Sequence, residues 1–251
     1  MRSDVLQLPP LLTGHPLAAS EDPFAEAVEA AAQGRLGAGD LVWSCDPDRV
    51  ELALVLEPEV AFGRAVEIAP LLWVAIMEAL AGAMPPKTSL ILRWPEVVLV
   101  NGGEVGRLDF AAATKAAGEV ADLLVVGACL QLSTIRDERD PGEAADRTSL
   151  AEEGGAEIEA HRLLGSIGAH LLTWINIWQD EGFPRVRESW IGRVEGHDCW
   201  APIRHGGASW TGRIIGIDET RALVVELAGD GGRLSLPLAD LFQLREEMAR
   251  S

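Results

Sequence analysis

Residues 68–84 form an apolar segment that restricts the possible folds more than any other part of the chain. Leu72, Ile76 and Leu80 recur at helical spacing, and the other faces of the segment are also mostly apolar. A helix that is apolar nearly all round is stable only when it is buried on most sides. The fold must therefore enclose this helix with other secondary-structure elements.

Short apolar and β-branched runs supply those elements. Two runs before the apolar helix, 41–45 and 50–56, are separated by a turn-forming triplet and predict a hairpin. Further strands are expected after it, at residues 89–94, 97–101, 105–110 and 123–132. One mixed or antiparallel sheet is implied, and an amphipathic helix over 158–178 is expected to lie across it. The fold class is therefore α+β, a mixed sheet packed by helices.

Both ends of the chain have local signals of their own. Asp22 can cap a helix, Pro23 suits its first position and Gly34 can end it, so we expect a helix over 24–33. Gly34 to Gly39 is then a glycine-rich loop. After about Gly196 the chain becomes a succession of short strand-like runs and turns, which predicts a small β-rich module.

Charge and cysteine content exclude several classes of protein. The formal net charge of −18 repels a phosphate backbone, so we expect no nucleic-acid binding. The three cysteines are odd in number and far apart, which favours a reducing compartment over a disulfide framework. The apolar stretch Val5–Leu12 is short and broken by proline, unlike a signal peptide, and we expect no apolar run that approaches the length of a membrane span. The predicted location is the cytoplasm.

An ordered set of motifs resembles the biotin/lipoate A/B protein ligase family, in its biotin protein ligase-like branch, over nearly the whole chain. Arg93-Trp94-Pro95-Glu96-Val97 is similar to the family's Lys-Trp-Pro-Asn-Asp, and residues 101–108 look like its next hairpin. Residues 125–131 resemble the strand that ends Gly-Ile-Asn, and Thr148-Ser149-Leu150 resembles its Thr-Ser-Leu. The resemblance implies a catalytic-type domain over 1–195 and a small SH3-like β-barrel domain over 196–251.

The family activates an acyl group: a carboxylate attacks ATP, and a carrier-protein lysine then takes the acyl group from the adenylate. These steps need positive charge at the phosphates and at the acyl carbonyl. Here the motifs are degenerate. The glycine-rich loop keeps Arg35 alone among the family's several arginines, and Gly103 stands where the family has a lysine. The remaining lysines, Lys87 and Lys115, lie in connectors and match no family catalytic position.

The resemblance nevertheless implies a set of site residues. Arg93, which can hold a carboxylate or phosphate with two hydrogen bonds, is the best catalytic candidate. We expect Arg35 to share that role, Trp43 and Trp94 to flank the ligand's ring or tail, and Gln131 to bind its head group. Tryptophans on strands are, without the resemblance, more often simply core. The full predicted ligand-binding set is Gly34, Arg35, Trp43, Arg93, Trp94, Asn101, Gly106 and Gln131.

Two functions follow from this pattern. The first is a biotin protein ligase-like protein that binds a biotin-, lipoate- or acyl-type ligand and, if active, joins it to a biotinyl or lipoyl carrier protein with ATP and Mg²⁺. The alternative is a non-catalytic binding module for a cofactor or carrier protein. No metal site is predicted, because His197, Cys199 and His205 match no familiar zinc spacing.

Overall fold

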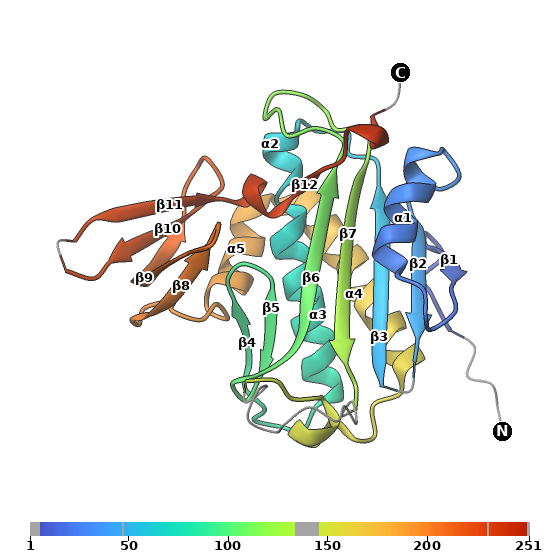
Figure 1. Cartoon of the computed structure of the whole chain (residues 1–251), viewed down its shortest axis with the longest axis horizontal. Coiled ribbons are helices and arrows are strands. Elements are labelled where there is room, and N and C mark those ends of the chain that lie inside the picture. The colour runs from blue at the N-terminus through green and yellow to red at the C-terminus, as the bar shows by residue number, and fades with distance from the viewer. Residues whose placement is uncertain (1–5, 47, 134–145, 230, 250–251) are drawn as a thin grey trace.

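The computed structural model describes residues 6–46, 48–133, 146–229 and 231–249. Figure 1 shows a large sheet with helices on both faces and a smaller sheet beside it. The large sheet has the order β1-β2-β3-β7-β6-β5-β4, with β12 paired to β6 outside this path. Its strands are β1 (Thr13–Pro16), β2 (Asp40–Cys45), β3 (Arg49–Leu56), β4 (Leu90–Arg93), β5 (Val97–Val100), β6 (Gly103–Ala112), β7 (Leu124–Gln131) and β12 (Gln243–Leu244).

The sheet is mixed, as predicted. β1 runs parallel to β2 and β12 runs parallel to β6, while the other neighbours are antiparallel. Side chains alternate between its faces. On β7, Leu124 and Val126 join the core beneath the large helices, whereas Val125 packs with the first helix on the opposite face.

The helices divide between those two faces. Helix α1 (Pro23–Ala32) covers β2, β3 and β7 on one side. The other side carries α2 (Phe62–Ala65), α3 (Ile68–Ala83), α4 (Ala160–Glu181) and α5 (Phe183–Ile191), drawn behind the sheet in Figure 1. Asp22 caps α1 as predicted, accepting hydrogen bonds from the backbone N–H groups of Phe24 and Ala25.

The buried apolar helix predicted at 68–84 is α3. With α2 it forms a segment, Phe62–Ala83, long and apolar enough to cross a membrane, so the prediction that no such run exists was wrong. In the fold, however, 83% of that segment's apolar window is buried inside the protein, as expected of a core helix. α4 and α5 pack along α3 and complete its enclosure.

The predicted β-rich tail is a four-stranded antiparallel sheet of order β11-β10-β9-β8. Its strands are β8 (Ala201–His205), β9 (Ala208–Ile217), β10 (Ala222–Leu227) and β11 (Arg233–Pro237), followed by the short 3₁₀ turns η2 (Leu238–Leu241) and η3 (Glu246–Met248). Another single turn, the π-type η1, spans Ala151–Gly155. The structure shows this sheet without its closure into an SH3-like barrel, so the barrel and the division at 195/196 stay predictions.

After η2 the tail returns to the large sheet. β12 pairs with Ala111 and Ala112 of β6, and the Phe242 ring packs against Phe62 and Phe110. Arg221, just before β10, donates to the buried Glu67 at the start of α3. The tail sheet and the large sheet therefore share one continuous core.

Candidate functional site

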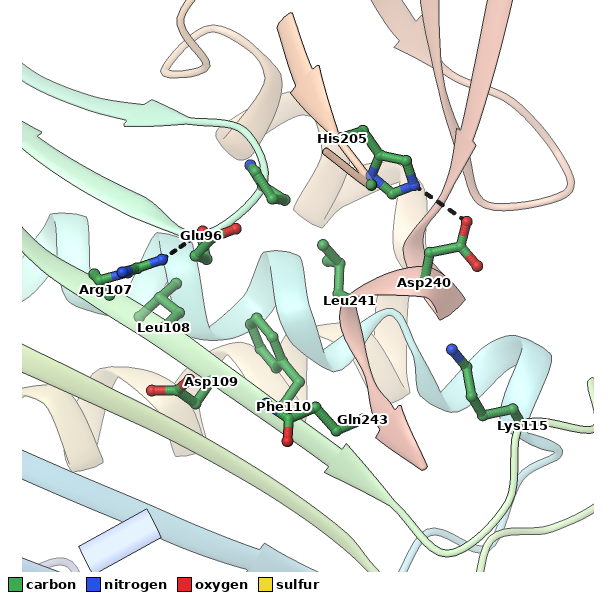
Figure 2. A pocket seen from close by; sticks show the side chains of 12 residues that line it. Glu96, Arg107, Leu108, Asp109, Phe110, Lys115, His205, Asp240, Leu241 and Gln243 are labelled. Atoms are coloured by element: carbon green, nitrogen blue, oxygen red, sulfur yellow. Dashed lines mark hydrogen bonds and ion pairs between the residues drawn. The ribbon is translucent and has the colours of Figure 1, made fainter. Parts of the chain in front are cut away.

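A cavity of about 540 Å³ lies beside β6, on the edge away from β7, where the strands that pair with β6 are interrupted. β5 pairs with β6 as far as Arg107, and β12 begins to pair only at Ala111. The tail reaches over the gap with the β8–β9 turn and with η2, as Figure 2 shows. The lining residues are Pro95, Glu96, Arg107, Leu108, Asp109, Phe110, Lys115, His205, Gly206, Asp240, Leu241 and Gln243.

Four titratable groups in this cavity form two pairs, and the two members of each pair lie within bonding distance of each other. Arg107 donates from Nη2 to Glu96 Oε1 at 2.9 Å, and this hydrogen bond raises the pKa of the guanidinium despite partial burial. The Nε2 atom of His205 lies 3.3 Å from Asp240 Oδ2. Trp94 stands behind this pair, its ring centroid 6.3 Å from that of His205. These groups shape the cavity but offer little free charge to a ligand.

Asp109 and Lys115 differ from the other charged groups of the cavity. Within the described residues, no hydrogen bond or ion pair involves either side chain. Burial raises the pKa of the Asp109 carboxyl; Arg107 lowers it, and the charges of Asp22 and Glu96 raise it further. Lys115 is exposed in the connector that follows β6. The cavity thus contains one acceptor and one cation without a protein partner.

A second cavity, of about 730 Å³, lies between α1 and the end of the tail. It shares Asp109 and Gln243 with the first, while Phe24 and Val28 of α1 add an apolar wall. Asp109 therefore faces the space on both sides of the returning tail strand.

On the same sheet face, next to the apolar residues that pack with α1, polar side chains of β2 and β3 bind each other. Ser44 donates to Glu51 at 3.1 Å, and Arg49 Nε lies 3.5 Å from the same carboxylate. Arg49 also donates to the Ala19 carbonyl at 3.2 Å. This hydrogen bond holds the loop before α1 against β3. Burial, aided by Glu51, raises the pKa of the Cys129 thiol to about 12. That thiol is not a ready nucleophile near neutral pH.

The two predicted cations lie far from each other and are both paired. Gly34 follows α1 with φ of +69°, and the next residue, Arg35, binds Glu26 at 3.0 Å on the outer surface of that helix. Arg93 ends β4 at the opposite edge of the sheet, where its Nε is 2.6 Å from Glu195. That hydrogen bond raises the pKa of the Arg93 guanidinium. The structure does not bring these two guanidinium groups to one site.

Trp43 and Trp94 also lie apart. Trp43 is on β2 and contacts His161 of α4 edge-on, whereas Trp94 follows β4 and contacts Trp73 of α3. Both rings are on the face covered by the large helices, and Trp94 is only 4% exposed. Only Trp94 comes near the cavity, through its neighbour Pro95 and through His205.

Three further predicted residues hold the backbone in place. Asn101, at φ of +50°, forms the tip of the β5–β6 hairpin and donates to Glu153 at 2.8 Å. Gln131 donates to the backbone carbonyls of Asp48 and Ser133 at 2.9 and 2.7 Å. Gly106 lies so close to the Cys129 carbonyl that an added Cβ would overlap it.

The position expected to hold the family's lysine is closed. A Cβ at Gly103 would overlap the Cγ2 atom of Thr148, because the backbone around Arg147 runs alongside Glu104 as a parallel bridge. The metal-capable residues of the tail are also dispersed, His197 lying near Asp198 and His205 near Asp240. Among the described residues, no group of three or more His, Cys, Asp or Glu side chains is placed to hold a metal ion.

The charged lining of the cavity is not among the residues predicted from the sequence. Arg107 and Asp109 alternate with the buried Leu108 and Phe110 along β6. Alternation with a period of two places both charged side chains on one face of the strand, and the sequence alone indicates it. Nothing comparable marked His205 and Asp240, which meet across 35 residues of sequence. Lys115 had been set aside as a connector residue, and its place in the cavity follows only from the fold.

Comparison with known proteins identifies what this architecture resembles. A family model described as the biotin/lipoate A/B protein ligase family matches residues 8–192. A biotin–[acetyl-CoA-carboxylase] ligase from Paracoccus denitrificans is 26% identical over 240 residues, which are 96% of this chain and 95% of that protein.

Solved structures agree with this match. A biotin protein ligase-like protein of unknown function from a Silicibacter species superposes with a TM-score of 0.84 at 32% identity, covering 95% of this chain and all of the other. Biotin protein ligase from Aquifex aeolicus gives a TM-score of 0.70 at 16% identity over 93% of this chain and 99% of that one. The same enzyme in complex with biotin and ATP gives 0.67 at 15% identity, covering 90% and 94%.

Proposed function

The chain belongs to the biotin/lipoate A/B protein ligase family, and on this premise we propose that it binds a biotin-, lipoate- or other acyl-type ligand in the cavity beside β6. The observation that carries the proposal is the cavity itself. Its volume of about 540 Å³ lies in the range typical of small-molecule sites, and it combines apolar walls with a few charged groups. The catalytic-type part and the tail both contribute to its lining.

Binding without adenylation fits the charges better than ligation does. Stabilising a transferring phosphoryl group requires cations that are free to turn toward it. In the described residues, Arg35, Arg49, Arg93 and Arg107 are each engaged by a carboxylate. The space expected for a catalytic lysine is occupied by Thr148. We therefore favour a biotin protein ligase-like binding protein over an active ligase.

The second candidate is an ATP-dependent ligase, and the Paracoccus relative favours it, because similarity to a protein named as a ligase extends over almost the whole of both chains. In that case ATP, Mg²⁺ and an acyl acid would be substrates or cofactors, and a biotinyl or lipoyl carrier protein would be the partner. Arg93 would then have to leave Glu195 to reach a carboxylate or phosphate. Under either candidate we place the protein in the cytoplasm.

A thermal-shift screen of the full chain tests the proposal. Biotin, lipoate and octanoate are added singly, with and without Mg-ATP. A ligand at about 100 times its Kd adds about 2.7 kcal/mol to the stability of the native state. The binding function predicts a shift with at least one acid and none with Mg-ATP alone. No shift with any of the acids would overturn it.

Pyrophosphate exchange separates the two candidates. The binding protein should show no exchange above background with any of the three acids. Acid-dependent exchange that is lost in Arg93→Ala would establish the ligase and give Arg93 its predicted role. Exchange that survives this substitution would remove Arg93 from the site.

A further inference from the structure

We propose that Asp109 and Lys115 determine which ligand the cavity accepts: Asp109 selects a head group that donates N–H hydrogen bonds, and Lys115 selects an anionic group at the other end. The inference rests on the proposed function, since both residues line the cavity assigned to the ligand. It adds a specificity that membership in the family does not imply, because acyl acids with and without N–H donors share the same carboxylate.

The position of Asp109 in the sheet leaves its carboxylate without a hydrogen-bond donor among the described residues. Asp109 lies opposite Gly127 of β7, over which the Phe24 ring of α1 packs, and neither of these residues has a side chain that can hydrogen-bond to the carboxylate. Arg107, whose charge lowers the pKa of the Asp109 carboxyl, is itself held at 2.9 Å by Glu96. Burial and the negative charges of Asp22 and Glu96 disfavour the ionised carboxylate. A donor brought by a ligand would supply the missing partner, and hydrogen bonds to charged groups are among the stronger ones.

Lys115 supplies the complementary group. Figure 2 shows it on the opposite side of the cavity from Asp109, with its ammonium directed inward below Asp240. Arg107 in this cavity is bound to Glu96, whereas Lys115 forms no hydrogen bond or ion pair with any residue that the structure describes. An anionic group, either the carboxylate of an acyl acid or a phosphate, would therefore meet Lys115 first.

Asp109 and Lys115 would thus bind opposite ends of one ligand. An acid whose head carries ureido or amide N–H groups satisfies Asp109 and Lys115 at once. An acid with a simple alkyl or dithiolane end leaves the Asp109 carboxylate buried without a donor, which costs affinity. Because one hydrogen bond to a charged group changes affinity by roughly 10- to 100-fold, the cavity should prefer the N–H-bearing acid by about that ratio.

Calorimetric titration of the full chain tests this with four probes. Biotin has both the N–H donors and the carboxylate, biotinamide keeps the donors without the carboxylate, octanoate keeps the carboxylate alone, and ATP offers phosphate. Asp109→Ala should weaken biotin and biotinamide about 10- to 100-fold and leave octanoate unchanged. Lys115→Ala should weaken biotin and octanoate but not biotinamide, and Lys115→Arg should restore them.

Controls make each result decisive. Lys87→Ala removes the other lysine of the chain, which also lies in a connector but not in this cavity, and should change no affinity. Asp109→Asn keeps the size of the side chain, so it checks that any loss in Asp109→Ala is not a folding defect. An unchanged biotin-to-octanoate ratio in both Asp109 variants overturns the role of Asp109.

The remaining outcomes concern Lys115 and the proposed function. If Lys115→Ala weakens ATP and spares the acids, Lys115 is a phosphate-binding residue and its assignment to a carboxylate fails. If wild-type protein binds biotin and octanoate but Lys115→Ala leaves both unchanged, the role of Lys115 alone is overturned. If the wild-type protein binds none of the acids, the proposed function falls and this inference with it.

Discussion

Arg221→Ala tests how the tail is held against the large helices, and hence how the cavity is closed. Arg221 Nε lies 2.6 Å from Glu67 Oε1, and Trp178 Nε1 donates to the other oxygen at 2.5 Å. The Glu67 side chain is 1% exposed, whereas that of Arg221 is 35% exposed. The carboxylate therefore depends on these two donors, which come from the tail and from α4.

The expected cost follows from what remains after the substitution. Removing one partner of a buried ion pair costs about 3–5 kcal/mol, because the other charge stays buried without compensation. Here Glu67 keeps its bond from Trp178, and water can enter where the partly exposed guanidinium was. We therefore expect a loss of about 2–3 kcal/mol in the free energy of unfolding, below the usual range.

Urea unfolding of the full chain measures this loss. Arg233→Ala is the matched control, since Arg233 is an exposed arginine on β11 of the same tail sheet and should change stability by less than about 0.5 kcal/mol. Adding Glu67→Gln to Arg221→Ala should recover part of the loss, because a neutral amide can still accept from Trp178. The reasoning is refuted if Arg221→Ala costs no more than the control, or if Glu67→Gln recovers nothing.

Three other properties follow from the same structure. Asp109→Asn should raise the thermal midpoint near pH 8. The pKa of Asp109 is raised in the folded state, so stability is lost as pH rises through this pKa and the carboxyl ionises. The increase in thermal midpoint should therefore disappear near pH 4. A gain that persists at low pH would contradict this. Gly103→Lys should lower the free energy of unfolding by about 1–3 kcal/mol, because the new Cβ overlaps Thr148, and adding Thr148→Ala should recover part of this loss. If the effects of the two substitutions on stability are simply additive, the two positions are not in contact. Ellman's reagent near neutral pH should label the exposed Cys199 rapidly and the partly buried Cys129 slowly, because burial raises the pKa of the Cys129 thiol to about 12. Labelling of Cys129 in the folded protein as fast as that of Cys199 would contradict this.

The fold could be predicted because its signals are local or periodic. The all-round apolarity of 68–84 required a central helix, which is α3. The turn-forming residues around 101–103 placed a hairpin that the structure confirms between β5 and β6. The family resemblance is also confirmed, because the match covers residues 8–192 and a structure at 32% identity superposes along almost the whole chain. Membership depended on the order of several weak motifs, and that order is a property of the sequence.

The site could not be predicted in the same way, because its charges are set by partners that are distant in sequence. Arg93 looked like a free clamp, yet it is held by Glu195, 102 residues away. Trp43 and Trp94 looked like one slot, yet β2 and β4 lie near opposite edges of the sheet. A motif shows which side chain is present, whereas the availability of that side chain depends on the tertiary pairing that satisfies it.

The closed position at Gly103 shows why the fold and the chemistry of this chain must be argued separately. An absent lysine alone would suggest an active site one substitution away from function. Thr148 occupies the space, however, and the arginines expected to assist are held by carboxylates, so restoring the lysine would disturb packing and still leave both arginines engaged. Asp109 and Lys115, whose side chains form no hydrogen bond or ion pair within the described residues, lie instead at the interrupted edge of β6, under the returning tail. Ligand recognition should therefore depend on the tail staying docked, so disrupting the pair of Glu67 and Arg221 should weaken binding through a contact outside the cavity.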